Sequence, residues 1–188
     1  MASLPTASFP IDWFIRPACC AALPLALALS ACGPTTAAKF APPCPVSGIL
    51  TDGADLTRFR GAGADLTDMV IDGRITGLSG KCSLDDDTHL RTAIAVTMEL
   101  ARGPASPDRA DQVTYFVAVS RDGHILDKQD VAIPVTFGEN NDRTRLTTSE
   151  VELVLPVTEN LSGAAYKITV GFQLTPKELA YNRRRGVR

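Results

Sequence analysis

Residues 166–174 read YKITVGFQL, and nearly every second residue of this segment is apolar. Tyr166, Ile168 and Val170 alternate with polar residues such as Lys167 and Thr169. Successive side chains of a β-strand point to opposite faces, so a period of two is typical of a strand with one buried face. The segment therefore predicts a half-buried strand near the end of the chain.

The same period recurs in five earlier segments, at residues 69–76, 93–100, 113–119, 131–137 and 151–155. Turn sequences separate them, above all Asp122-Gly123, which suits a tight hairpin turn. Pro134 has no N–H to donate, so its strand is expected at a sheet edge or with a bulge. Six or seven antiparallel strands within residues 44–175 predict an all-β, immunoglobulin-like sandwich. The core tryptophan of true immunoglobulin domains is absent, because Trp13 is the only tryptophan.

A short helix and a basic tail are expected at residues 176–188. Thr175 suits an N-cap, Pro176 the first helical position and Glu178 the third residue of a capping box. The expected helix reaches about residue 182. The cations that follow are Arg183, Arg184, Arg185 and Arg188. They complement the helix dipole and either contact an anionic partner or form a solvated tail.

The N-terminal 31 residues resemble a bacterial export signal. A single cation, Arg16, precedes an apolar run at residues 18–31 that is too short for the roughly 20 residues of a membrane-spanning helix. The run closes with LSAC at residues 29–32, which resembles the lipobox of lipoprotein precursors. The motif implies cleavage before Cys32 and acylation of that residue. An ordinary secreted protein with a cysteine near the cleavage site is the alternative.

Lipidation of Cys32 would determine where in the cell the protein is located. Two or more acyl chains hold a protein firmly on a membrane, whereas one binds reversibly. Residues 32–43, rich in Pro, Thr and Ala, are then a flexible tether. Gly33 stands where an Asp commonly marks inner-membrane retention, so an outer-membrane lipoprotein facing the periplasm is expected.

The expected mature chain has 188 − 31 = 157 residues, enough for one domain. Removing Arg16 and Asp12 with the signal leaves 18 basic and 20 acidic residues, a balance that does not indicate nucleic-acid binding. Cys44 and Cys82 remain after lipidation, and an oxidising periplasm favours a disulfide between them. Free thiols or a metal site with the two histidines are the alternative.

Nine short segments span most of residues 44–183: CP at 44–45, GIL at 48–50, LTRFR at 56–60, DLTD at 65–68, LSGKC at 78–82, RGP at 102–104, YFVAV at 115–119, GFQLTP at 171–176 and LAYNR at 179–183. Together they resemble an uncharacterised family of lipoproteins from α-proteobacteria. The resemblance implies a lipoprotein and brings no catalytic residues with it.

Other motifs are incomplete. Asp85 to Asp87 with His89 are part of a cation site at most, because Ca²⁺ takes six or more ligands, so a solvated hairpin loop is the expectation. Ser79 is not within a Gly-x-Ser-x-Gly motif. Residues 58–60 are expected in a basic, partly apolar loop, with salt-bridge partners as the equal alternative for Arg58 and Arg60. A flexible connector is expected at residues 61–65, since the third glycine of a phosphate-binding loop is missing.

The sequence thus predicts a membrane-tethered, non-catalytic binding or assembly module of the cell envelope, with no cofactor. Its partner is expected to be another envelope protein or an anionic envelope polymer. A small-ligand or metal-binding lipoprotein using residues 85–89 is one alternative. A hydrolase of envelope polymers is the other.

Overall fold

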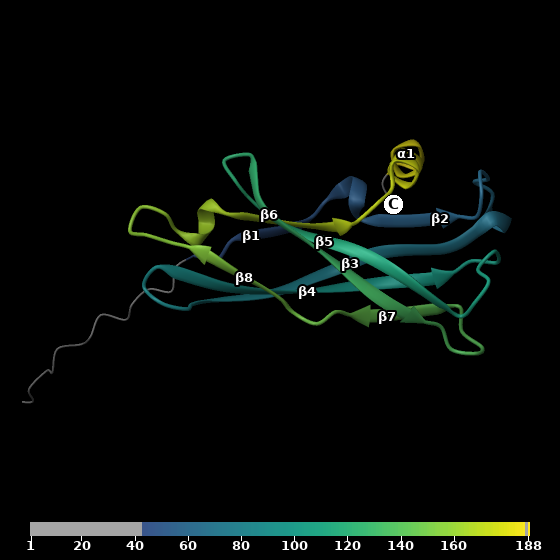
Figure 1. Cartoon of the computed structure of the whole chain (residues 1–188), viewed down its shortest axis with the longest axis horizontal. Helices are drawn as coiled ribbons and strands as arrows, with labels where there is room; N and C mark the ends of the chain where they lie inside the picture. Colours follow the sequence, from purple (N-terminus) through teal and green to yellow (C-terminus); the bar gives the residue numbers. More distant parts are fainter. Residues whose placement is uncertain (1–42, 187) are drawn as a thin grey trace, which may run out of the picture. The chain divides into compact units, whose positions relative to one another are not determined.

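The computed structural model describes residues 43–186 and 188. Two sheets make up this part of the chain (Figure 1). Sheet 1 contains, in spatial order, β1 (Val46–Ile49), β9 (Lys167–Phe172), β5 (Ala110–Arg121) and β6 (His124–Thr136). Sheet 2 contains β2 (Asp55–Phe59), β3 (Met69–Leu84) and β4 (His89–Arg102), and β4 also pairs with β7 (Arg143–Thr147) and β8 (Val151–Pro156).

The remaining elements are helical. Single-turn 3-10 helices lie at Thr51–Gly53, Leu66–Asp68 and Gly163–Ala165, and α1 spans Pro176–Arg185 and contacts β2 (Figure 1). The predicted capping box of α1 is confirmed, because the Thr175 side chain accepts from the Glu178 N–H while the Glu178 carboxylate accepts from the Thr175 N–H. Among the described residues no helix has both the length and the apolar character needed to cross a membrane.

A single hydrophobic core fills the space between the two sheets. Its largest fully buried side chains include Tyr115 on β5 and Phe172 on β9 from sheet 1, and Ile71 on β3 and Leu100 on β4 from sheet 2. Every second side chain of these strands faces the core, which is the period that the sequence shows. The predicted all-β sandwich is confirmed.

Two predicted local features are also confirmed. Asp122 and Gly123 both have positive φ, 51° and 81°, which is the two-residue hairpin turn expected between β5 and β6. Strand β6, which contains Pro134, lies at the edge of sheet 1.

The described residues form nine strands where six or seven were expected, since β1, β2 and β7 carry no clear alternation. Arg58 and Phe59 belong to β2 and not to a loop, and Ser79 lies within β3, paired with Ala95. The connections also differ from the immunoglobulin pattern, in which the last strand pairs with the strand that precedes it. Here β9 pairs with β5 and with β1, and β8 lies in sheet 2.

Candidate functional site

Two rows of side chains cross the outer face of sheet 2. The cross-strand register aligns β2, β3, β4 and β7, so that each row takes one residue from each strand. The rows are Asp55, Arg74, Glu99 and Arg145, and Thr57, Asp72, Ala101 and Arg143. Side chains directly opposite one another on neighbouring strands lie close enough to interact.

The first row alternates in charge across all four strands. Arg74 lies 3.9 Å from the Asp55 carboxylate, and Arg145 lies 3.4 Å from Glu99. Each charge therefore has an opposite charge beside it. The two positive and two negative charges of this row therefore compensate one another.

The second row is interrupted at its third position. Thr57 donates a hydrogen bond of 2.9 Å to Asp72, but Ala101 then stands where the first row has Glu99. The guanidinium of Arg143, on the far side of Ala101, makes no ion pair with any residue that the structure describes. The small side chain of Ala101 also leaves room above the sheet.

A pocket of about 320 Å³ lies at this interruption. Residues of both rows line it, together with Arg188 from the C-terminal tail. Four of the lining side chains are guanidinium groups and two are carboxylates: Arg74, Arg143, Arg145 and Arg188 against Asp72 and Glu99. The pocket is rich in donors that suit a planar oxyanion.

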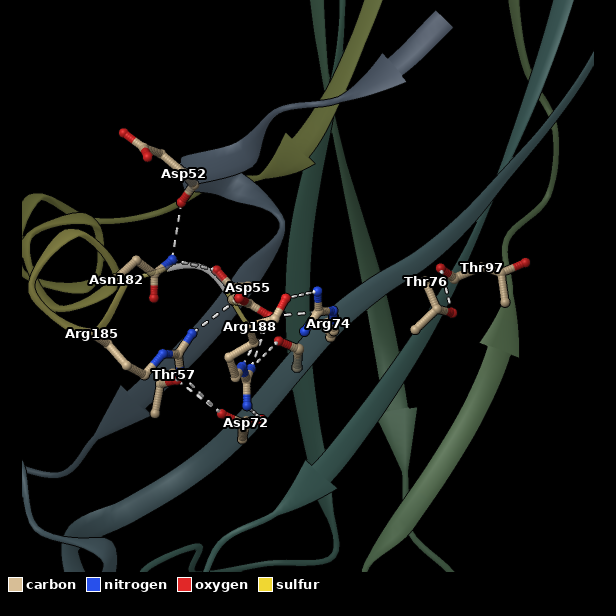
Figure 2. A network of polar contacts seen from close by, with 11 residues as sticks. Asp52, Asp55, Thr57, Asp72, Arg74, Thr76, Thr97, Asn182, Arg185 and Arg188 are labelled. Atoms are coloured by element: carbon tan, nitrogen blue, oxygen red, sulfur yellow. Dashed lines mark hydrogen bonds and ion pairs between the residues drawn. The ribbon is translucent and has the colours of Figure 1, made fainter.

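Asp55 binds the C-terminal tail beside the pocket through ion pairs with two arginines. Its side chain is only 7% exposed, and its two oxygens lie 3.1 Å from Arg185 and 3.0 Å from Arg188 (Figure 2). Arg188 also binds Asp72 at 2.9 Å, and Arg74 donates to the main-chain oxygen of Arg188. One buried carboxylate thus organises three arginines.

The pKa of Arg188 reflects these contacts. Burial alone would lower it, but hydrogen bonds to Asp72 and Asp55 outweigh the burial and hold the pKa above its ordinary value. Arg188 is therefore a permanent cation of this site.

The helix end contributes three further contacts. Asn182 donates to the main-chain oxygens of Asp52 and Asp55 at 3.0 and 2.7 Å (Figure 2). Arg183 binds the Asp52 carboxylate at 2.9 Å. The Nη2 atom of Arg185 is within ion-pair distance of Asp55, yet both Nη2 and Nε lack a hydrogen bond of good geometry and are buried.

Three of the four arginines that were expected to contact an anionic partner are therefore bound to carboxylates of their own domain. They are Arg183, Arg185 and Arg188. Arg184 is exposed, with no ion pair to the described residues. Sequence reasoning missed Arg143 and Arg145, because they lie on a strand whose polar sequence hides its period.

The expected disulfide is present. Cys44 and Cys82 are bonded, with their Cα atoms 5.9 Å apart. Cys44 precedes β1 of sheet 1 and Cys82 lies in β3 of sheet 2, so the bond joins the two sheets covalently. Cys32, the expected lipidation site, and residues 1–42 as a whole lie outside the described residues.

The loop at residues 85–89 is the hairpin between β3 and β4, as expected. Asp85 binds Arg91 at 2.9 Å, and Asp86 accepts hydrogen bonds from Thr88 and from His89. The hydrogen bonds from Thr88 and the nearby His89 lower the pKa of Asp86 from 3.8 to about 2. No group of three or more His, Cys, Asp or Glu side chains in the described part of the chain is arranged to hold a metal ion.

Comparison with family models, with curated proteins and with solved structures gives no match.

Proposed function

We propose that this protein is a membrane-tethered envelope lipoprotein that binds an anionic group of an envelope component without transforming it. The lipobox that ends at Cys32 supports the tether and the periplasmic address. The single observation that carries the binding function is the arginine-lined pocket on the outer face of sheet 2.

The positive charge that an anion would meet is concentrated on β7. Asp55 and Asp72 form ion pairs with the arginines of β3 and of the tail, and Glu99 forms one with Arg145. The charge of Arg143 is not compensated by a carboxylate of the described residues, because its cross-strand neighbour is Ala101. An oxyanion above Ala101 would occupy the position that Glu99 occupies in the first row, with Arg143 as its main ligand.

Guanidinium groups bind carboxylates and phosphates through paired N–H donors, and such charged hydrogen bonds contribute about 1.5–3 kcal/mol each. A polymer with repeated phosphate or carboxylate groups would add the contribution of Arg145 at the rim. Binding of this kind weakens as salt rises, because exposed charges are screened.

The test is a calorimetric titration of the purified full-length lipoprotein in nonionic detergent with inorganic tripolyphosphate. Arg143→Ala is expected to weaken binding by about tenfold, which corresponds to about 1.4 kcal/mol. Ala101→Glu should have the same effect, because it supplies the missing carboxylate within the chain. Lys81→Ala, which removes an exposed cation outside the pocket, is the control. Equal binding by wild type and Arg143→Ala would refute the proposal.

The tether is tested separately by mass spectrometry of the protein isolated from its own membranes. We expect a mature N-terminus at Cys32 that carries the mass of two or three acyl chains. An unmodified Cys32, or cleavage at another residue, would exclude the anchor while leaving the binding site untouched.

A second candidate function is assembly through the edge of sheet 1. Strand β6 pairs with β5 on one side only and is exposed from His124 to Asp130. An unpaired edge can add a strand from a partner. Lys128, Asp130 and Pro134 on this strand are, however, the residue types by which edges avoid association. The pocket is therefore the better supported site.

A further inference from the structure

A second pocket, of about 220 Å³, lies between β2, the loop that follows it and the first turns of α1. It shares no lining residue with the arginine-lined pocket. The side chains that matter for its chemistry are Arg58 and Phe59 from β2, and Lys177, Glu178, Tyr181 and Arg184 from α1.

Two aromatic rings form the apolar part of this pocket. The Phe59 and Tyr181 rings meet edge to face, with centroids 5.0 Å apart and planes at 71°. The Arg185 guanidinium lies over the Tyr181 ring at 5.4 Å and helps to fix its position. Both rings are only half-buried, although apolar surface of this size is usually covered. Because the two planes are nearly perpendicular, a ligand ring that stacks on one of them meets the other edge to face.

The only carboxylate in the lining is already engaged. Glu178 is 8% exposed, one of its oxygens caps the helix through Thr175, and the other lies 3.3 Å from Arg58. Arg58 binds Asp111 as well, at 3.3 Å. Both oxygens of Glu178 are therefore bound within the protein, so this carboxylate is not directed at a ligand.

Two cations of the pocket have no carboxylate partner in the described residues. Lys177 donates only to the main-chain oxygen of Gly61, at 2.6 Å, and Arg184 is exposed. Lys177, Tyr181 and Arg184 are spaced i, i+4 and i+7, which places them on one face of α1. On this face one cation therefore lies about one turn before Tyr181 and the other about one turn after it.

From this arrangement we infer that the pocket binds a ring-bearing oxyanion, that is, a phosphate or carboxylate attached to an aromatic or pyranose ring. The ring stacks on one of the two aromatic rings and meets the other edge to face. Arg184 binds the charged group, because Lys177 is already hydrogen-bonded to the main-chain oxygen of Gly61. The ring and the charge are both required, since neither a neutral ring nor a bare anion uses the whole site. The inference is independent of the proposed function.

The probe experiment uses the three tyrosines of the chain. Tyr115 and Tyr166 are at most 1% exposed, so in protein labelled at tyrosine only the Tyr181 ring signal should shift when a ligand enters this pocket. We would titrate the full-length lipoprotein in detergent with phenyl phosphate, glucose 1-phosphate and inorganic phosphate. The two ring compounds separate an aromatic from a pyranose ligand, and inorganic phosphate measures the anion alone.

At least one ring phosphate is expected to bind about tenfold more tightly than inorganic phosphate, with the Tyr181 signal shifting in step. Arg184→Ala should weaken this binding by about fivefold or more, since it removes a charged hydrogen bond. The adjacent Arg183→Ala, which removes a cation outside the pocket, should change it by less than about twofold.

Three results would overturn the inference: equal affinity for inorganic phosphate and both ring phosphates, equal effects of the two arginine substitutions, or an unshifted Tyr181 signal. All three variants, including Arg143→Ala, replace exposed side chains, so their folding is checked by thermal unfolding. A negative result for this pocket would not refute the proposed tripolyphosphate site, because the two pockets share no lining residue. For the same reason Arg143→Ala should not alter binding of a ring phosphate to this pocket.

Discussion

Replacing Asp55 with Asn should destabilise the protein by about 2 kcal/mol. Removing one partner of a fully buried ion pair costs about 3–5 kcal/mol, because the other charge stays buried without compensation. The Asp55 side chain is 7% exposed, but those of its partners Arg185, Arg188 and Arg74 are 21%, 35% and 40% exposed. Water can therefore solvate part of the three guanidinium groups, which lowers the expected cost.

The assay is equilibrium unfolding of the full-length lipoprotein in urea, followed by tyrosine fluorescence. Asp52→Asn is the matched control, because Asp52 makes one ion pair with Arg183 and is 45% exposed. An exposed pair contributes at most about 1 kcal/mol. If Asp55→Asn costs no more than Asp52→Asn, then Asp55 does not organise the tail, and our account of the network is wrong.

Three other predictions concern the disulfide, a close backbone contact at Gly103 and the loop carboxylate Asp86. Reducing the disulfide, which closes a loop across a sequence separation of 38, should lower the free energy of unfolding by about 4 kcal/mol in urea titrations with and without reductant. Gly103→Ala should cost about 2 kcal/mol or more, since the added methyl group would overlap the main-chain oxygen of Met69, whereas Gly48→Ala meets nothing within 4 Å and serves as its control. The Asp86 carboxyl should titrate by NMR near pH 2 and not near 3.8. Because that pKa is depressed in the folded state, its contribution to stability is complete above about pH 4 and disappears as the pH falls through 2; titration at the ordinary value would contradict the loop geometry.

The parts of the fold that could be predicted are those with a strong local signal. Long strands with one face in the core alternate clearly, and the helix cap and the hairpin turn depend on residues within four positions of one another. The disulfide is predicted from the expected compartment and from the number of cysteines that the expected lipidation leaves free. Each of these rests on information that is close together in the sequence or in the composition.

The strands that were not predicted, among them β2 and β7, lack such a local signal. Strand β2 buries Asp55 and Thr57, which read as exposed residues until their partners are known. Strand β7 reads RTRLT, because one face of it carries the arginines of the pocket. Arg188 and Asp55 are 133 positions apart, so nothing local indicates that one binds the other. The site could not be predicted from the sequence, because its polar residues come together only through the pairing of strands that are far apart in the chain.

The position of the disulfide also bears on how the domain responds to force. If the acyl chains on Cys32 anchor the protein, a pull on the membrane reaches the domain at Cys44, two residues before β1. Strand β1 has four residues and only β9 as a neighbour, so by itself it would detach under a small load. The bond to Cys82 passes that load to β3, a 16-residue strand paired on both sides. The anchor would thus pull on a long strand that is paired on both sides, and the proposed binding face would stay intact while the envelope moves.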